Sequence, residues 1–239
     1  MNIVRYGESG LLLNFEQVIS IKTHSKVLAV QHFLQKNPPE GVDYFIPSYC
    51  SIVVRFDQSK TTFEQLKQEL DAADLSFSET KTSLRQWHIP VCYDDVFGPD
   101  LNSTSLFLNI SKDELIEFHT GQVYHVFACG FLPGFPYMGI TDERLRVKRH
   151  DTPRQKVPAG SVGLAGNQTG IYPSESPGGW QIIGRTPLKL IRDDLKMPFL
   201  FRPGDVVHFQ RISTKDFEEI YQKEETGNLN INNYLNGAN

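Results

Sequence analysis

The first 85 residues alternate short strand-like runs with two helical patterns. Apolar residues recur at helical spacing over residues 20–35, and an Asn-Pro-Pro sequence at 37–39 should end that helix. A second amphipathic pattern begins after Thr61 or Thr62, either of which can cap the helix. Four strand-like runs surround the helices: NIVRYG, GLLLNFE, VDYFIP and CSIVVRFD. Residues 1–85 are therefore predicted to form a small α+β domain.

From residue 86 onward the pattern changes to short strands separated by many turns. Ser111 and Glu114 form a capping-box pattern at the second of two short helices, which Gly121 should end. Residues 130–187 then hold 10 of the 18 glycines and 7 of the 14 prolines, interleaved with large apolar residues. Short strands joined by tight turns accommodate that mixture, so residues 86–225 are predicted to form an all-β barrel domain.

The end of the chain combines two strands, a helix and a polar tail. The runs LKLI and VVHFQRI flank the turn RPGD, and Ser213 with Asp216 marks the start of a last helix. Half of the final twelve residues, NLNINNYLNGAN, are asparagine. Residues 226–239 are therefore predicted to be a frayed tail.

Composition and charge narrow the range of functions. The 239 residues carry a formal net charge of −4 without a clustered basic face, which argues against nucleic-acid binding. No apolar run approaches the ~18 residues of a membrane span, and the N-terminus has no signal-peptide pattern. Cys50, Cys92 and Cys129 show no metal-ligand spacing, so no metal site is predicted. We expect a cytoplasmic protein with reduced, buried cysteines, while a catalytic role for Cys129 stays open.

Familiar nucleotide and hydrolase motifs are absent from the sequence. It contains no GxxxxGK[ST] loop, no GxGxxG after a strand, no HExxH and no GxSxG. If ATP takes part in the function, this chain is therefore not expected to build the whole nucleotide site by itself.

The block from Asp151 to Leu190 is the strongest candidate for a binding site. Its closely spaced prolines and glycines impose unusual backbone angles and can direct backbone N–H and C=O groups at a ligand. Two guanidinium groups, Arg154 and Arg185, lie among hydroxyl, amide and aromatic side chains. Because an arginine fork matches a carboxylate, this set suits a small carboxylate with an adjacent amide.

Ordinary structural roles stay open for the same residues. Arg154 and Arg185 can pair with carboxylates on a solvated face, and Trp180 can be a core anchor. His125, on a predicted strand, can be a packed histidine or a general base. The glycines and prolines can simply form the turns of a barrel.

Three stretches together are distinctive: GFLPGFPYMG, PRQKVPAGSVGLAGNQTGIYPSESPGGWQIIGRTPL and RPGDVVHF. They resemble the family of the B subunit of bacterial 5-oxoprolinase, also called allophanate hydrolase subunit 1 or carboxyltransferase subdomain C and D. That family includes an inhibitor of a sporulation histidine kinase. The resemblance extends from RYGESGLLL to FRPGDVVHFQRIS and implies an α+β N-terminal domain followed by a cyclophilin-like β-barrel. Two departures, at residues 94–97 and at Cys129, concern local loop shape.

The resemblance implies ATP-dependent opening of 5-oxoproline to glutamate, carried out with an A subunit and a C subunit. Phosphorylation of the lactam oxygen, with ATP and Mg²⁺ at a site shared with a partner, would activate the ring for attack by water. Residue type and position suggest the substrate-binding candidates Phe135, Tyr137, Arg154, Ser161, Gln168, Thr169, Tyr172, Trp180 and Arg185. The catalytic candidates are Arg185, Gln168 and His125. Replacement of Arg185 by alanine is expected to abolish substrate-dependent ATP hydrolysis.

Two other functions stay open. A regulatory protein would dock on a histidine kinase through an exposed apolar surface at residues 130–139. A subunit of an allophanate- or urea-type amide hydrolase or carboxyltransferase would share the fold, although neither a biotinyl domain nor a serine–lysine amidase pattern is visible. In the 5-oxoprolinase interpretation, residues 130–139 form a rigid aromatic wall shared by the barrel core and the interface with the C subunit.

Overall fold

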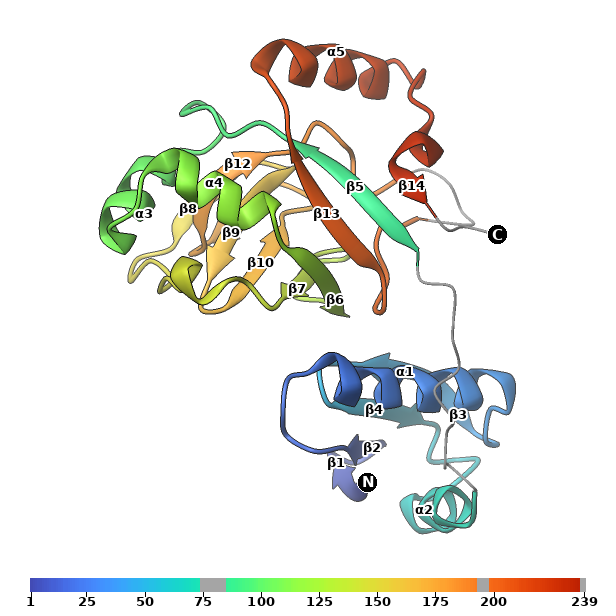
Figure 1. Ribbon diagram of the computed structural model, residues 1–239. Helices are drawn as coiled ribbons and strands as arrows, with labels where there is room; N and C mark the ends of the chain where they lie inside the picture. The colour runs from blue at the N-terminus through green and yellow to red at the C-terminus, as the bar shows by residue number, and fades with distance from the viewer. Residues whose placement is uncertain (74–84, 193–197, 237–239) are drawn as a thin grey trace. The chain divides into compact units, whose positions relative to one another are not determined.

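The computed structural model describes residues 1–73, 85–192 and 198–236, which belong to two compact units, Met1–Thr82 and Ser83–Asn239 (Figure 1). Each unit has its own sheet and its own hydrophobic core. The part of the chain that is described contains five α-helices. The protein is therefore a mixed α/β protein.

The N-terminal unit is a four-stranded antiparallel sheet with two helices. The strand order is β1 (Asn2–Tyr6), β2 (Gly10–Asn14), β4 (Ser51–Phe56) and β3 (Val42–Pro47). The helices are α1 (Ile21–Lys36) and α2 (Phe63–Ala72). Alternate residues of β4, namely Ile52, Val54 and Phe56, are fully buried in a core that α1 shares, which explains the period-two pattern of that run.

Helix starts follow the local sequence signals. The side chains of Ser20, Thr62, Ser111 and Ser213 accept a backbone hydrogen bond at the start of α1, α2, α4 and α5, respectively. The last three form reciprocal capping boxes. The capped starts predicted for α2, α4 and α5 are confirmed, because a cap needs only residues that are neighbours in sequence. The helix predicted over residues 20–35 from apolar spacing is α1, and Ser20 is its cap.

The C-terminal unit is built on a curled, mostly antiparallel sheet of eight strands. The strand order is β12 (Gln181–Arg185), β9 (Ser161–Ala165), β10 (Gln168–Ile171), β7 (Pro136–Gly139), β6 (Val123–Cys129), β13 (Val206–Arg211), β5 (Gln86–Val91) and β14 (Leu235–Asn236). Two further strands, β8 (Arg154–Val157) and β11 (Ser176–Gly178), pair separately. The β13–β5 pair is parallel.

Helical elements accompany this sheet. They are α3 (Leu101–Leu108), α4 (Lys112–Thr120), α5 (Thr214–Glu225) and the 3₁₀ helices η1 (Glu143–Leu145) and η2 (Ile231–Tyr234). In Figure 1, α3 and α4 lie side by side at one flank of the unit, while α5 lies across one end of the sheet. The prediction of an all-β domain for residues 86–225 is therefore wrong in this respect, since helices flank the sheet.

The predicted closed barrel is not seen among the strands described. β12 and β14 are the two edges of the sheet. The sheet nevertheless curls until Cys92, directly after β5, exchanges two backbone hydrogen bonds of 2.9 Å with Arg185 at the end of β12. A single bridged pair is not a continuous ladder, so these strands approach closure without completing it.

The chain end is more regular than the predicted frayed tail. β14 pairs with β5, with Leu235 opposite Trp87, and Tyr234 and Leu235 pack on the main core. The apolar residues among the asparagines provide this attachment. The prediction of a frayed tail, which rested on the asparagine content, is therefore wrong for the described residues of this segment. Residues 237–239 lie outside the described range.

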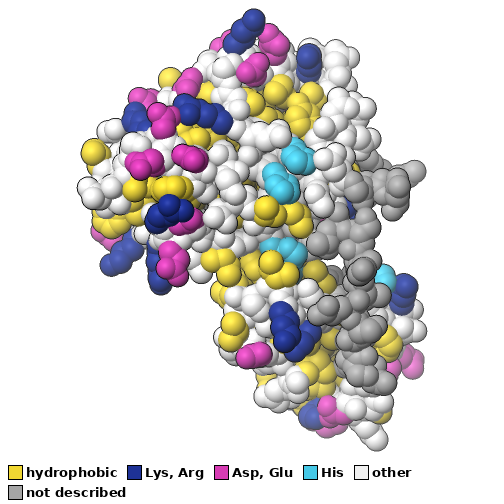
Figure 2. Space-filling view, in the orientation of Figure 1, with side chains coloured by type: hydrophobic (Ala, Val, Ile, Leu, Met, Phe, Trp, Pro, Cys, Tyr) yellow, Lys and Arg dark blue, Asp and Glu magenta, His cyan; other side chains and the backbone are white. Residues whose placement is uncertain are grey.

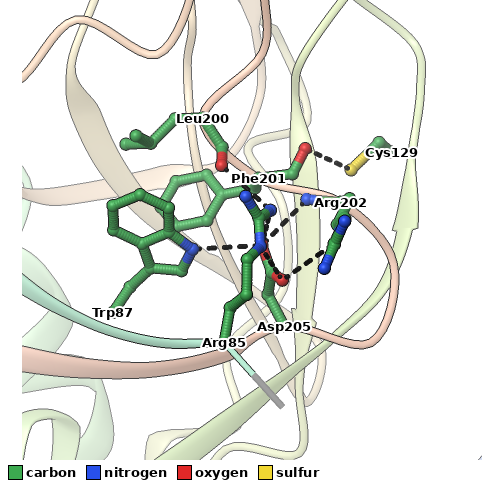
Figure 3. Close-up of polar contacts among 7 residues, drawn as sticks. All are labelled: Arg85, Trp87, Cys129, Leu200, Phe201, Arg202 and Asp205. Atoms are coloured by element: carbon green, nitrogen blue, oxygen red, sulfur yellow. Dashed lines mark hydrogen bonds and ion pairs between the residues drawn. The ribbon is translucent and has the colours of Figure 1, made fainter. Parts of the chain in front are cut away.

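The turn RPGD is held by a buried carboxylate (Figure 3). Asp205, 2% exposed, accepts hydrogen bonds from Arg85 Nε at 2.8 Å and Nη2 at 2.5 Å, from Trp87 Nε1 at 3.1 Å and from the Arg202 backbone N at 3.0 Å. Both carboxylate oxygens are used. This network therefore fixes the turn before β13 against the start of β5.

No helix within residues 1–73, 85–192 and 198–236 has the length and apolarity required to cross a membrane. On the face of the molecule seen in Figure 2, Lys and Arg side chains are interspersed with Asp and Glu. That face therefore carries no extended field of one charge.

Candidate functional site

The C-terminal unit contains a groove of about 590 Å³, here called the aromatic groove. Its volume lies within the ~300–1,000 Å³ typical of small-molecule sites. The walls come from segments that are far apart in sequence, since β7, β9, β10 and β11 all contribute. The lining residues are Phe131, Phe135, Tyr137, Lys148, Arg149, Ala165, Gly166, Gln168, Tyr172, Gly178 and Trp180.

Phe135 is the centre of an aromatic cluster in this groove. Its ring centroid lies 4.9 Å from that of Tyr137, 5.1 Å from that of Tyr172 and 5.5 Å from that of Trp180. The last two pairs meet edge to face, a favoured geometry worth about 0.5–1.5 kcal/mol per pair beyond area burial. Phe135 and Tyr172 are each 1% exposed, so the cluster forms a rigid floor.

Two glycines of the Gly/Pro block make room for these rings. A Cβ on Gly178 would overlap the hydroxyl of Tyr172. A Cβ on Gly170 would lie 3.0 Å from Phe135 Cε1 and 2.8 Å from the Pro136 carbonyl oxygen. Glycine is needed at both positions because backbone and ring approach each other closely.

Phe131 stands apart from the other aromatic residues. Its φ of 68° lies in the left-handed region, which is uncommon for a residue with a side chain. It is 68% exposed, and its ring lies 6.1 Å from that of Phe135. The stretch 130–139 therefore combines a buried floor residue with an exposed ring at the edge of the groove.

Lys148 and Arg149 bring positive charge to the groove. Both are exposed, and no ion pair within the described part of the chain includes either of them. Their backbone is fixed, since Gln181 Nε2 donates to the Lys148 carbonyl at 3.0 Å and the His150 N–H donates to the Gly179 carbonyl at 2.7 Å. The groove therefore offers two cations on a defined backbone.

The two tyrosines of the groove are held in their protonated form. Burial raises the pKa of Tyr137, and the Arg149 charge opposes that shift. Burial also raises the pKa of Tyr172, opposed by a hydrogen bond from the Trp180 backbone and by Arg149. Both hydroxyls remain protonated at neutral pH, and Arg149 lies close enough to influence both.

Arg154 and Arg185 do not line the aromatic groove. Arg154 pairs with the buried Asp100 and also donates to His150 Nε2 at 2.8 Å. Arg185 donates from Nε to the Ala159 carbonyl at 2.7 Å, at the far end of β12 from Trp180. Five residues of extended strand correspond to roughly 16 Å. Neither arginine is among the residues that line the aromatic groove, and Arg154 already has a carboxylate partner.

Three other predicted site residues are buried outside the groove. Thr169 donates to the Gly163 carbonyl at 3.1 Å and contacts His119 Nε2 at 3.0 Å. Ser161 is 2% exposed at the start of β9. His125 is 5% exposed on β6, and burial lowers its pKa, with Asp205 opposing that shift. These positions favour packing roles.

Cys129 lies next to the Asp205 network. Its Sγ is 3.8 Å from the Phe201 carbonyl (Figure 3). Burial raises the pKa of this thiol to about 12, with the charge of Asp205 adding to the shift. A thiol that stays protonated at neutral pH is a poor nucleophile, which argues against a catalytic cysteine here.

Sequence reasoning named five of the groove residues and missed its cations. Phe135, Tyr137, Gln168, Tyr172 and Trp180 come together as wall residues. Lys148 and Arg149 were not named, although they end a basic run, RLRVKR, directly before the Gly/Pro block. That run was the available signal.

A second hollow, of about 520 Å³, lies where α5 begins. It is lined by Asp94, Ser213 and Thr214 together with Arg211, Ile212 and Lys215. Arg211 pairs with Asp113 at 2.8 Å, and Thr214 donates to Asp94. Because these partners already bind each other, the aromatic groove is the better candidate.

Comparisons with known proteins identify relatives of the whole fold. The family model of the carboxyltransferase domain, subdomain C and D, matches residues 1–201. The chain is 37% identical to the B subunit of 5-oxoprolinase from Bacillus subtilis (strain 168) over 233 residues, which cover 93% of this chain and 97% of that protein.

Two solved structures show the same architecture. The crystal structure of TTHA0988 matches 85% of this chain with a TM-score of 0.76 and 33% identity, and the match spans 40% of that longer chain. The K. lactis urea amidolyase structure matches 95% of this chain, and 16% of its own, with a TM-score of 0.80 at 18% identity, a likeness of fold alone. Together with the family match over most of its length, these relatives show that the chain belongs to the carboxyltransferase subdomain C and D family, which includes the B subunits of 5-oxoprolinase.

Proposed function

We propose that the chain is the B subunit of a cytoplasmic, ATP-dependent 5-oxoprolinase and that the aromatic groove binds 5-oxoproline. The observation that carries the proposal is a pair of cations, Lys148 and Arg149, in an aromatic groove whose volume suits a small molecule. Neither cation pairs with a carboxylate among the described residues. The name of the B. subtilis relative supports the same substrate. The proposal includes a cyclophilin-like fold for the C-terminal unit, which the curl of its sheet from β5 to β12 supports.

The groove residues have distinct roles in this proposal. Arg149, whose fork matches a carboxylate, holds the substrate carboxylate together with Lys148. The faces of Trp180 and Tyr137 pack on the lactam ring and exclude water. The protonated hydroxyls of Tyr137 and Tyr172 donate hydrogen bonds where negative charge develops on the lactam oxygen. Gln168 supplies an amide for the lactam N–H.

ATP and the partner subunits complete the reaction in this proposal. ATP, bound with Mg²⁺ at a site shared with the C subunit, supplies a phosphoryl group to the lactam oxygen. This phosphorylation activates the lactam carbonyl carbon for nucleophilic attack by water. The chain contributes binding and orientation, and the A and C subunits contribute the remaining groups. A shared site agrees with the absence of a phosphate-binding loop motif from this sequence.

The test is 5-oxoproline-dependent ADP release by this chain alone, with a C subunit, and with both partners. Activity is expected only on mixing, and Arg149→Ala should lower kcat/KM by about 10²-fold or more, since a charged hydrogen bond to a carboxylate is lost. Arg146→Ala, an exposed arginine of the same segment outside the groove, is the matched control.

Three outcomes separate the interpretations. Loss of activity in Arg185→Ala alone would return the carboxylate site to the far end of β12. Full activity of Arg149→Ala would remove the groove from the site. No activity in any combination of subunits would contradict the 5-oxoprolinase function itself.

The similarity in fold to urea amidolyase suggests allophanate as a second candidate substrate. Allophanate also combines a planar amide with a carboxylate, so the same groove chemistry would accept it. Turnover of allophanate in place of 5-oxoproline would favour that function. Inhibition of a histidine kinase, abolished by Phe131→Ser, would favour the regulatory role, since Phe131 is the exposed ring of the groove.

A further inference from the structure

A cluster of three ionisable residues lies behind the cation segment of the groove. Asp100 is 3% exposed, and its two oxygens accept hydrogen bonds from Arg154 Nη2 and, at 2.7 Å, from the Ile182 backbone N. Arg154 Nη1 lies 2.8 Å from His150 Nε2, which is also 3.3 Å from Asp100 Oδ2. Because a guanidinium only donates, Arg154 Nη1 is the donor in its contact with His150 Nε2.

The cluster is anchored to the strand that follows Trp180. The Asp100 N–H donates to the Ile182 carbonyl at 2.9 Å, while the Asp100 carboxylate accepts from the Ile182 N–H. Asp100 therefore cannot shift without breaking a reciprocal pair of hydrogen bonds with β12. Arg154, which comes from β8, is tied to that fixed point.

The cluster adjoins Arg149, because His150 is the next residue in the chain. His150 donates its backbone N–H to the Gly179 carbonyl at 2.7 Å, and Gln181 Nε2 holds the Lys148 carbonyl at 3.0 Å. Arg149 lies between these two attachments. Its Nε is 3.7 Å from the point where a Cβ on Gly179 would lie, so the side chain runs across that glycine.

We propose that Asp100, Arg154 and His150 form a positioning cluster that fixes Arg149 in the aromatic groove for binding of a small carboxylate. This inference rests on the proposed function for its ligand, but its geometry concerns Arg149 alone. Arg154 acts through His150 and does not touch the substrate. Arg154, which the sequence suggested as a carboxylate ligand, is thus a positioning residue that does not contact the substrate carboxylate itself.

Arg154→Lys is the sharpest variant. It keeps the positive charge beside Asp100 but loses the planar fork that reaches Asp100 and His150 together. Because the Arg154 side chain is 34% exposed, the substitution should leave the fold intact. Arg144→Lys is the matched control, since Arg144 forms a fork with Asp142 at 2.8 and 2.6 Å on the same segment without contacting the cluster or the groove.

The first measurement needs no substrate. In protein labelled with ¹⁵N-arginine, the Nε–H resonance of Arg149 is identified by its loss in Arg149→Lys. We expect Arg154→Lys to move this resonance to the position of a solvated, disordered arginine, and Arg144→Lys to leave it unchanged. An unchanged Arg149 resonance in Arg154→Lys would overturn the proposal.

The second measurement is steady-state ADP release with the partner subunits. Arg154→Lys should raise KM for 5-oxoproline on the order of tenfold, less than the ~10²-fold loss that a full 1 Å misplacement can cause, with kcat within about twofold. In an Arg149→Ala background, Arg154→Lys should have no further effect on KM. An additive loss would show a purely structural role and contradict the positioning cluster.

The two measurements distinguish two kinds of failure. If the unmodified complex releases no ADP with 5-oxoproline, the proposed function is wrong, and the Arg149 resonance alone decides the positioning role. If ADP release is normal and KM does not change in Arg154→Lys, the positioning role is wrong and the function stands.

Discussion

Two charged regions of the C-terminal unit differ in how completely their groups are paired. At the RPGD turn, Asp205 and Arg85 are 2% and 10% exposed and are joined by two hydrogen bonds (Figure 3). At the aromatic groove, Lys148 and Arg149 are exposed and form no ion pair with any described residue. The first arrangement stabilises a fold, while the second leaves charge for a ligand.

The comparison assigns roles that residue type alone does not. All three arginines Arg85, Arg149 and Arg154 lie within the part of the chain that resembles the same family, yet they have different partners. Arg85 and Arg154 each donate to a buried carboxylate, whereas Arg149 has no carboxylate partner among the described residues. Partner geometry therefore distinguishes Arg149 from the other two arginines.

The largest expected effect is on folding. Asp205→Ala should lower the free energy of unfolding by about 3–5 kcal/mol, because it removes a buried carboxylate that accepts hydrogen bonds from Arg85, Trp87 and the Arg202 backbone. Urea unfolding monitored by tryptophan fluorescence measures it. Arg149→Ala, an exposed change, should alter this free energy by less than ~0.5 kcal/mol. Similar losses in the two variants would erase the distinction between the regions.

The free energy of unfolding should also depend on pH through His119, a buried neutral side chain. His119 contacts Tyr93 at 2.8 Å and Thr169 at 3.0 Å, and burial lowers its pKa from 6.5 to about 3. The unfolded chain binds the proton more readily between these values, so stability is complete above pH 6.5 and falls as pH drops toward 3. The loss should be about 2–3 kcal/mol between pH 6.5 and 4.5.

His119→Gln supplies the reference for that measurement. This variant lacks the titrating group, so its stability disadvantage relative to the unmodified protein should narrow by the same amount as pH falls. Chemical unfolding at pH 7 and at pH 4.5 gives the two differences. Parallel pH profiles would mean that His119 is protonated as easily in the folded state as in the unfolded chain.

The smallest expected effect on stability is that of Gly178→Ala, which tests whether the floor of the groove is rigid. Gly178→Ala places a Cβ against the Tyr172 hydroxyl and should cost about 1–3 kcal/mol of stability through overpacking. Gly130→Ala is the control, since open space surrounds its Cβ position. Thermal unfolding of both variants tests this. Equal melting temperatures would show that the Tyr172 ring moves without cost, and the groove floor would not be rigid.

Local signals in the sequence predicted much of the fold. The starts of α2, α4 and α5 follow from caps whose partners are three residues away, and α1 follows from its apolar spacing. The alternating pattern of β4 predicted its buried face. The tail was misjudged because β14 is stabilised by pairing with β5, about 150 residues earlier in the chain, which no local composition records.

For the candidate site, the sequence indicated the aromatic walls but not the charge. Phe135, Tyr172 and Trp180 were identifiable because a dense Gly/Pro block with large rings is unusual and must be packed closely. Arg149 was not identifiable, because an exposed arginine in a basic run has no distinguishing local feature. Only its position beside the rings marks it.

Residues close together in the sequence are enough to set the short-range order of this protein: its helix caps, its alternating buried faces and its close contacts at glycine. Tertiary structure alone decided that Arg154 faces Asp100, 54 residues away, that Arg85 faces Asp205, 120 residues away, and that Lys148 and Arg149 face the groove. The physical reason is that an ion pair depends on distance in space, and contacts between residues so far apart in sequence are fixed only when the sheet curls and its strands meet.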